Sequence, residues 1–463
     1  MQQLSAAIAA NRFGLGARPG ELASIGGGGR DWLRAQLAAA PPRLADAQLR
    51  SCADVLAQAL ALQREIQAAR KSGGAAQLEA VQKLPQLLRP IYVAEVTARL
   101  AQAVTTERPF TERLTQFWSN HFAVSTDKQY LAGLAGAFER EAIRPHVLGS
   151  FGELLIAAET HPAMLLYLDN HLSVGPHSRA ALRAGLRYGE RRIGINENLG
   201  REILELHTLG VGGGYTQADV TTFAEVITGW SIGGGQGRFA GGEPGRFRFR
   251  PELHEPGAKA VLGRRYPDSG YGQGVEVLND LAEHPSTARH IADKLARHFI
   301  ADDPPPAAVE RLAQAFTASG GDLPTVYRAL IDEHEAWTRP LAKFKTPSDY
   351  IVSTYRALAV PVDAAHAALA PFELLGQRTW TPGSPAGWPD RSADWDGASA
   401  LLKRIEWADN VAGRFGGRIY ATQLAPQLLG ANLSEATRSE LAHAASPAQA
   451  LTLLLAAPEF LRR

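Results

Sequence analysis

Residues 196–230 read NENLGREILELHTLGVGGGYTQADVTTFAEVITGW, and this stretch decides the fold class. Apolar side chains recur three and four residues apart over 197–209, which is the spacing of one helix face. A run of glycines follows, and glycine is the usual residue just beyond the end of a helix. Thr216 and Asp219 then have the spacing of a capping box, with Asp in place of Glu. We therefore expect two consecutive helices, 197–209 and 216–228.

The same helical periodicity returns along most of the chain. It predicts a helical hairpin, 45–70 and 77–104, and a polar loop at 173–194. RFRFRPEL alternates as a strand does, within a Gly-rich segment. The expected fold is mainly α: a multi-helix globular body with a small β-hairpin insertion near residues 231–271. Further helices are expected at 111–122, 131–143, 150–159, 162–168, 275–300, 307–317, 323–335, 346–359, 363–374, 398–413, 434–443 and 447–456.

The length and composition indicate how the chain is organised. A chain of 463 residues, 45% of them hydrophobic, can bury a large core. We predict a single large helical domain, 1–463. If it divides, the expected parts are an N-terminal helical hairpin region at 1–110, a core body at 111–230 and 272–463, and the Gly-rich β excursion at 231–271.

Charge and hydropathy exclude some classes of partner. Lys plus Arg number 48 against 47 Asp plus Glu, so the chain lacks the broad positive field of a nucleic-acid binder. No stretch approaches the roughly 20 apolar residues of a membrane span, and the start lacks the pattern of a signal peptide. Cys52 is the one cysteine, which excludes an internal disulfide. We expect either a cytoplasmic protein or one exported already folded with a partner.

The segment 196–207 carries the densest set of polar groups. On a helix, Asn198, Glu202 and Glu205 fall at i, i+4 and i+7 and share one face. Glu197 and Arg201 lie with Glu205 on the adjacent face. Carboxylates this close either pair with a cation or raise one another's pKa, which prepares a general acid. A structural ion network and a functional site both fit this pattern.

Three further polar clusters occur elsewhere in the chain. Asn120 and His121 stand in FWSNHF, Asp169 in YLDNH, and His254 and Lys259 in LHEPGAK. With 196–207 they are more than core packing needs, so we predict that they line one cleft. The alternative is that each cluster ties a loop to a helix end.

The histidines and the tryptophans each allow two interpretations. His121, His171 and His254 lack the local spacing of metal ligands, so no cofactor is predicted and a divalent metal is a minor alternative. Trp230 follows the second helix, and three more tryptophans crowd the loop TWTPGSPAGWPDRSADWDG at 379–397. These rings either stack on sugars or aromatic ligands, or staple an irregular loop to the body.

Six motifs together resemble a bacterial family catalogued as domain of unknown function 1800. In order, they are RLTQFWSNHF, HPAMLLYLDN, NENLGREILELHTLG with GGYTQADVTTFAEVITGW, HEPGAKAVLG, HPSTARHIADKL and PAGWPD. The match runs from about residue 6 to the end of the chain. The resemblance implies a mostly helical fold but no reaction. It also implies a genetic neighbour of the family catalogued as domain of unknown function 1501, which looks like the phosphatase superfamily and is exported folded through the twin-arginine route.

Two positions depart from the pattern of this family. Glu255 stands where relatives commonly have Asp, and His207 stands where many have Phe. The second departure counts against His207 as an essential metal ligand.

These residues predict an enzyme of unknown substrate with a carboxylate-centred, acidic cleft. Paired carboxylates favour hydrolysis of a glycosidic or other polymer bond. One alternative is a non-catalytic partner or assembly protein that acts with the exported neighbour, docking through 231–271 and the Trp-rich loop. Another is a metal-dependent enzyme with His and carboxylate ligands. The residues predicted for catalysis are Glu202, Glu205, Glu197, Asp169 and His121. Those predicted to bind substrate are Asn120, Asn198, Arg201, Tyr215, Trp230, His254 and Lys259.

Overall fold

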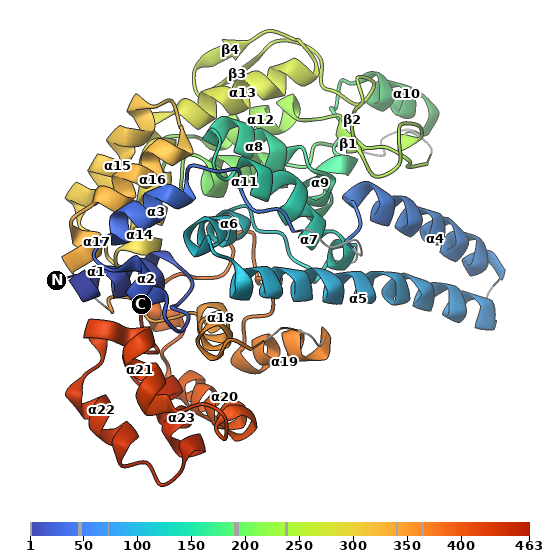
Figure 1. Cartoon of the computed structure of the whole chain (residues 1–463). Coiled ribbons are helices and arrows are strands. Elements are labelled where there is room, and N and C mark those ends of the chain that lie inside the picture. The colour runs from blue at the N-terminus through green and yellow to red at the C-terminus, as the bar shows by residue number, and fades with distance from the viewer. Residues whose placement is uncertain are drawn as a thin grey trace.

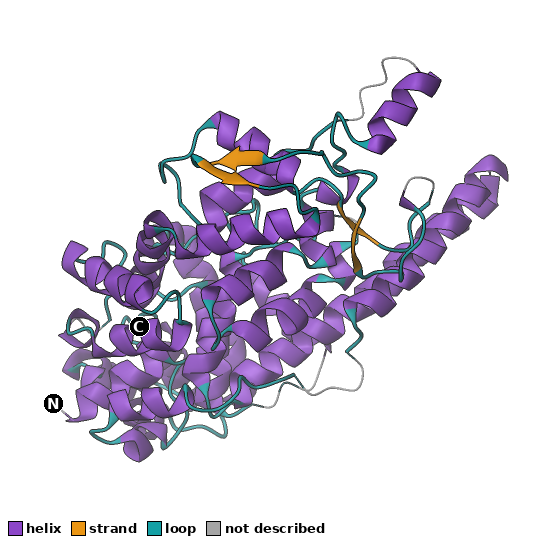
Figure 2. Cartoon of the chain, turned by 90° about the horizontal axis from the view of Figure 1, so that it is seen from above, coloured by secondary structure: helices purple, strands orange, loops and turns teal. Residues whose placement is uncertain are grey.

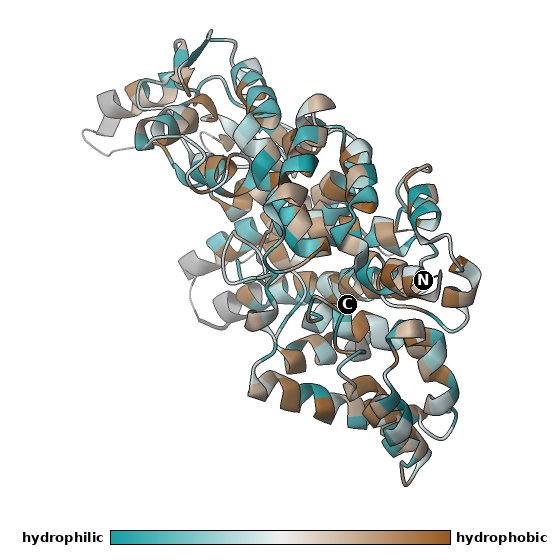
Figure 3. Ribbon diagram, turned by 90° about the vertical axis from the view of Figure 1, so that its left-hand side faces the viewer, coloured by the Kyte–Doolittle hydropathy of each residue, from teal (hydrophilic) through white to brown (hydrophobic). Residues whose placement is uncertain are grey.

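Helices form nearly all of the regular structure in the computed structural model of the chain (Figure 1). Most of these helices carry both apolar and polar residues (Figure 3), and a helix of this kind can bury one face and expose the other. This confirms the predicted mainly α fold. The structure describes residues 2–44, 49–72, 74–128, 130–188, 194–236, 239–338, 341–360, 362 and 365–463.

Three helices from distant parts of the sequence contribute side chains to the same region of the molecule. They are α6 (Pro109–His121), α14 (Pro285–Phe299) and α18 (Pro347–Leu358). Each begins with proline, whose fixed φ suits the first turn and whose missing N–H is not needed there. Side chains cap two of them: His284 accepts from the backbone N of Ser286, and Thr346 accepts from that of Asp349.

The helical hairpin predicted near the N-terminus is present. Helix α4 (Cys52–Ser72) packs against the long α5 (Gly74–Thr105), which runs across the molecule in Figure 1. The predicted start at residue 45 was too early, because 49–51 are not helical; residues 45–48 lie outside the described part of the chain.

The predicted helix 197–209 has a change of geometry inside it. Helix α11 (Asn198–Glu202) continues into a π-helical turn, Ile203–His207, and the next helix is α12 (Gln217–Val226). The π-turn rotates the later residues relative to an ideal α-helix. The prediction that Glu205 shares a helix face with Asn198 and Glu202 therefore does not hold beyond residue 202. The capping box at the start of α12 is confirmed, because its two side chains bond reciprocally.

The β structure lies where it was predicted, between residues 230 and 266. Strand β1 (Trp230–Ile232) pairs antiparallel with β2 (Phe247–Phe249), and β3 (Lys259–Val261) pairs antiparallel with β4 (Arg264–Tyr266). Figure 2 shows both pairs as small insertions at the edge of the helical body. The segment therefore holds two short hairpins among its described residues.

Several segments differ from the predictions. The expected helix 275–300 is two helices, α13 (Tyr271–Glu283) and α14, because Pro285 pushes His284 into extended backbone. The polar loop at 173–194 contains α10 (Arg179–Tyr188). Helix α21 (Ala421–Leu429) was not predicted; it forms despite an internal proline.

The remaining helices come from the N-terminal, middle and C-terminal parts of the chain. The C-terminal group, α20 to α23, packs together and forms the lower part of Figure 1. The last residues then return to the centre, where Arg463 and Lys343 exchange backbone hydrogen bonds. The other helices are α1 (Gln2–Ile8), α2 (Glu21–Ile25), α3 (Gly29–Gln36), α7 (Ala135–Phe138), α8 (Phe151–Glu159), α9 (Pro162–Tyr167), α15 (Pro306–Ala318), α16 (Leu323–Asp332), α17 (Glu335–Thr338), α19 (Ala365–Leu375), α20 (Ala398–Phe415), α22 (Glu435–Ala442) and α23 (Pro447–Ala456).

Candidate functional site

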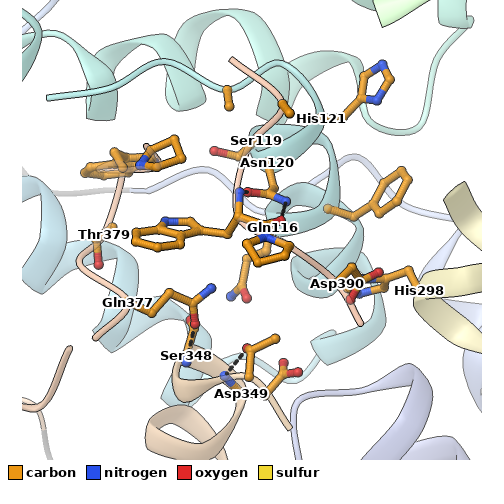
Figure 4. Close-up of a pocket in the computed structure, with 18 of the residues that line it drawn as sticks. Gln116, Ser119, Asn120, His121, His298, Ser348, Asp349, Gln377, Thr379 and Asp390 are labelled. Atoms are coloured by element: carbon orange, nitrogen blue, oxygen red, sulfur yellow. Dashed lines mark hydrogen bonds and ion pairs between the residues drawn. The ribbon is translucent and has the colours of Figure 1, made fainter. Parts of the chain in front are cut away.

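A cavity of about 350 Å³ lies between α6, α14, the start of α18 and the Trp-rich loop 379–397. Its volume is within the range of small-molecule sites in proteins. Figure 4 shows neutral polar side chains of α6 on one side and Asp390 with His298 on another. The wall thus combines aromatic rings, amides and ionisable groups.

One face of α14 brings three ionisable side chains toward α6. His290, Lys294 and His298 are spaced by four residues, so they form a single row along the helix. Both ends of the row touch α6. The His290 ring lies 6.2 Å from that of His121, and the His298 ring lies 5.4 Å from that of Phe117. Lys294, midway between them, lines the cavity.

The Trp-rich loop is fastened to α6 by a single amide side chain. Asn120 Nδ2 donates to the backbone O of Trp388 at 2.9 Å, and its Oδ1 accepts from the backbone N of Trp388 at 2.8 Å. Gly387 makes this approach feasible, because its φ is +82° and a Cβ there would lie 2.3 Å from the backbone O of Asn120. Trp380 and Trp395 are buried, so the loop turns these rings inward.

Charged side chains form a tight cluster at one end of the cavity. Arg113 Nη1 lies 3.0 Å from Asp349 Oδ1, and Arg463 Nε lies 3.0 Å from Asp349 Oδ2. His298 Nδ1 lies 2.9 Å from Asp390 Oδ2, and Arg463 Nη2 lies 3.7 Å from Asp390 Oδ1. Burial by itself raises the pKa of both aspartates, but the neighbouring cationic and histidine groups outweigh it and lower both. Both carboxylates therefore stay ionised.

Lys294 differs from these charged groups because it has no counter-charge in contact. Its amine makes no hydrogen bond or ion pair with the residues that the structure describes. Burial lowers its pKa from 10.5 to about 8, against the raising effect of Asp390. Burial also lowers the pKa of His298, to about 4. The His298 ring is therefore neutral at physiological pH.

Three further nitrogen atoms on the cavity wall lack partners. Gln116 Nε2, Trp388 Nε1 and His121 Nδ1 are all buried, and none has a hydrogen bond within the described chain. An unpaired buried polar atom costs on the order of 1–3 kcal/mol. The residues of the cavity wall therefore carry several buried polar atoms whose hydrogen-bonding capacity is unused within the described chain.

Of the predicted residues, Asn120 and His121 line this cavity. Asn120 holds the loop, as described above. His121 Nε2 lies 3.1 Å from the backbone O of His207, and burial holds its pKa well below the ordinary value. His207 itself is fully buried, with Nδ1 2.7 Å from Oε1 of the equally buried Glu159.

The predicted residues of α11 and its surroundings lie outside the cavity lining. Glu197 pairs with Arg201 at 3.0 Å and accepts from Gln217 and Thr221 of α12, at 3.0 and 2.7 Å. For Glu197 and Arg201, these contacts correspond to the structural ion network, which was one of the two interpretations of this segment. Asn198 is exposed.

Glu202 and Glu205 are both partly exposed. Glu205 is hydrogen-bonded to Tyr215, and the charged neighbours of Glu202 include His207, Arg201 and Glu159. Burial, Glu205 and Glu159 raise the pKa of Glu202, and His207 opposes them. Burial and Glu205 raise the pKa of Tyr215. The two carboxylates thus form a separate acidic group.

The other predicted residues serve turns and packing where the structure describes them. Asp169 has a left-handed backbone and pairs with Lys128 at 2.6 Å. Lys259 Nζ donates to the backbone O of Pro256 at 2.6 Å. His254 Nδ1 lies 3.1 Å from the backbone O of Thr228, and Trp230 is fully buried. The structure does not bring these residues to the cavity, and the predicted single cleft is not formed there.

Sequence reasoning missed Lys294, His298, Asp349 and Asp390. A signal existed in HPSTARHIADKLARHF, whose His, Lys and His repeat every four residues. Asp390 follows Trp388 by two residues and ends the motif PAGWPD of the Trp-rich loop. The histidines proposed as metal ligands do not assemble: within the described residues, no group of three or more His, Cys, Asp or Glu side chains could hold a metal ion.

The fold and the cavity define a mainly α-helical protein with a polar pocket built from distant segments. The chain belongs to the family described as protein of unknown function DUF1800, whose model matches residues 8–462. No curated protein and no solved structure matches this chain. Within the described residues, none of the helices has the length and apolar character needed to cross a membrane.

Proposed function

We propose that this protein is an enzyme, a hydrolase, and that its active site is the cavity between α6, α14 and the Trp-rich loop. The observation that carries the proposal is the Lys294 amine, which is partly buried on the cavity wall without a partner. Removing an amine from water without a counter-charge is unfavourable for folding. Such a cost is typical of groups that act on a ligand.

Lys294 suits proton transfer near neutral pH. General acids work best when their pKa lies close to the working pH, and that of Lys294 is lowered to about 8. In the proposed reaction, water adds to the electrophilic centre and the bond to the leaving-group oxygen breaks. Lys294 protonates that oxygen and then regains a proton from the added water, so atoms and charge balance.

Activity measurements on Lys294 variants test this proposal. The full-length protein would be assayed against chromogenic phosphate esters, sulfate esters, carboxylate esters and aryl glycosides. We expect turnover of one class, reduced at least roughly 100-fold in Lys294→Met, with Lys403→Met on the exposed side of α20 as the matched control. Turnover at the wild-type rate in a folded Lys294→Met protein would contradict the assignment.

Glu202 and Glu205 remain a second candidate centre for hydrolysis. The raised pKa of Glu202, caused by burial and then by its acidic neighbours, supports it as a general acid. Glu202→Gln distinguishes the two centres in the same assays. Loss of turnover in this variant, with Lys294→Met still active, would move the active site to α11.

A non-catalytic role beside the neighbouring exported protein of the 1501 family is the other proposal. One surface supports it: Leu402 and Ile405, on consecutive turns of α20, are 57% and 46% exposed. Co-purification of the two proteins, compared with the Leu402→Lys variant, tests this role. No complex with the folded wild-type chain would count against it.

A further inference from the structure

Three of the unpaired groups on the cavity wall are hydrogen-bond donors. The fourth, His121 Nδ1, is an acceptor, because the Nε2 of this neutral ring faces the backbone O of His207. Lys294 offers an ammonium group, Gln116 an amide N–H and Trp388 an indole N–H. Indole and ammonium groups cannot accept hydrogen bonds, so a ligand that satisfies them must supply acceptor atoms.

The elements that carry these donors are in contact with one another. Gln116 lies one turn before Asn120 on α6, and Asn120 fixes the backbone of Trp388 through two hydrogen bonds. Lys294 occupies the middle of the α14 row, whose ends contact Phe117 and His121. All three side chains line the same cavity.

The local charge also favours an anion. The two aspartates of the wall already have counter-charges: Arg113 and Arg463 contact Asp349, while Lys343 and Arg463 lie near Asp390. Lys294 remains with no described anion in contact. A negative ligand would thus gain a charge-assisted hydrogen bond without displacing an existing ion pair.

We infer that the substrate carries an oxyanion, and that Lys294, Gln116 and Trp388 hold it. The inference rests on the proposed function, because it places the substrate in the same cavity. Phosphate, sulfate and carboxylate groups share this chemistry. In the hydrolytic reaction, the bound oxyanion would keep the reacting bond beside the Lys294 amine.

Calorimetric titration of the full-length protein with sodium phosphate, sodium sulfate and sodium acetate tests the inference without requiring turnover. We expect at least one anion to bind saturably, and its identity distinguishes tetrahedral from carboxylate oxyanions. Lys294→Met should weaken binding at least roughly tenfold. Trp388→Phe, which keeps an aromatic ring but removes the N–H, should weaken it roughly fivefold. Lys403→Met should bind as the wild type does.

Two outcomes would overturn the inference. One is that none of the three anions binds the folded wild-type protein; the other is that Lys294→Met and Trp388→Phe, both folded by circular dichroism, bind as tightly as Lys403→Met. Turnover of a neutral substrate without anion binding would remove this inference and leave the proposed function intact. Anion binding without turnover of any ester or glycoside would support the inference and weaken the proposed function.

Discussion

Lys294 carries a cost to stability that a substitution should reveal. Its folded pKa of about 8 lies below the ordinary 10.5, mainly because of burial. The unfolded chain therefore binds more protons between these two values, and wild-type stability should rise with pH across that window. Below it the cost is fully present, so Lys294→Met should raise the free energy of unfolding near pH 7 by on the order of 1 kcal/mol. Urea denaturation at several pH values measures both effects, with Lys403→Met as control; a less stable Lys294→Met protein would contradict the argument.

Gly387 offers a second test at the scale of one residue. Alanine at its φ of +82° is strained, at a cost of about 1–3 kcal/mol. The added Cβ would also meet the backbone O of Asn120 at 2.3 Å. We expect Gly387→Ala to lower the midpoint of urea unfolding and to release the loop from α6. Gly383, where a Cβ meets nothing within 4 Å, provides the control as Gly383→Ala. Equal midpoints for the two variants would show that the close approach does not matter.

At the scale of elements, Asp219 links the start of α12 to the second hairpin. Its Oδ2 accepts from the backbone N of Thr216 at 2.9 Å, and its Oδ1 accepts from the backbone N of Leu262 at 2.7 Å. Thr216→Ala removes only the cap and should cost about 1 kcal/mol. Asp219→Ala leaves the Thr216 side-chain cap in place but removes the reciprocal bond to the backbone N of Thr216 and the link to Leu262, so it should cost about 2 kcal/mol. Chemical denaturation of both variants gives the comparison, and an equal loss would mean that the link to Leu262 adds nothing.

Long periodic segments were the elements that the sequence predicted well. The capping box of α12 follows from contacts within a few residues, and helices α4 and α5 follow from the periodicity of their own sequences, which sequence spacing describes directly. The predictions were wrong where one local feature interrupted the helical periodicity of the sequence. Pro285 split the helix expected at 275–300, and the π-turn 203–207 rotated the carboxylates out of their predicted register.

The candidate site was less predictable because its residues meet only after folding. Asn120 was singled out for its motif, yet its partner Trp388 is 268 residues away. Helix spacing shows that His290, Lys294 and His298 share a face, but not that this face meets α6. Burial also decides which groups are unusual. Lys294 looks ordinary in the sequence, and its pKa is lowered mainly by burial, which only the folded structure shows.

At the scale of the whole molecule, the charged cluster joins four distant segments. Arg113 comes from α6, Asp349 from α18, Asp390 from the Trp-rich loop, and Arg463 from the C-terminal residues. All four belong to the same network beside the cavity. The packing of these segments and the shape of the site are therefore coupled, and disturbing one charge should affect both.

Arg463→Met should destabilise the folded protein strongly. Arg463 is 1% exposed, and its loss leaves Asp349 with Arg113 and Asp390 with fewer positive neighbours. Removing one partner from a buried ion pair costs about 3–5 kcal/mol. The folded pKa of both aspartates is below the ordinary 3.8, so their stabilising contribution is present above that value and is lost as pH falls through the folded pKa.

Urea midpoints measured near pH 7 and at steps below pH 4 follow this contribution. Wild-type stability should fall steeply in acid, and that of Arg463→Met should start lower near pH 7 and fall less, because the variant has lost part of the cause of the lowered pKa values. The exposed Arg438→Met is the control and should follow the wild type. Parallel acid profiles for Arg463→Met and the wild type would show that Arg463 does not control the charge of the two aspartates.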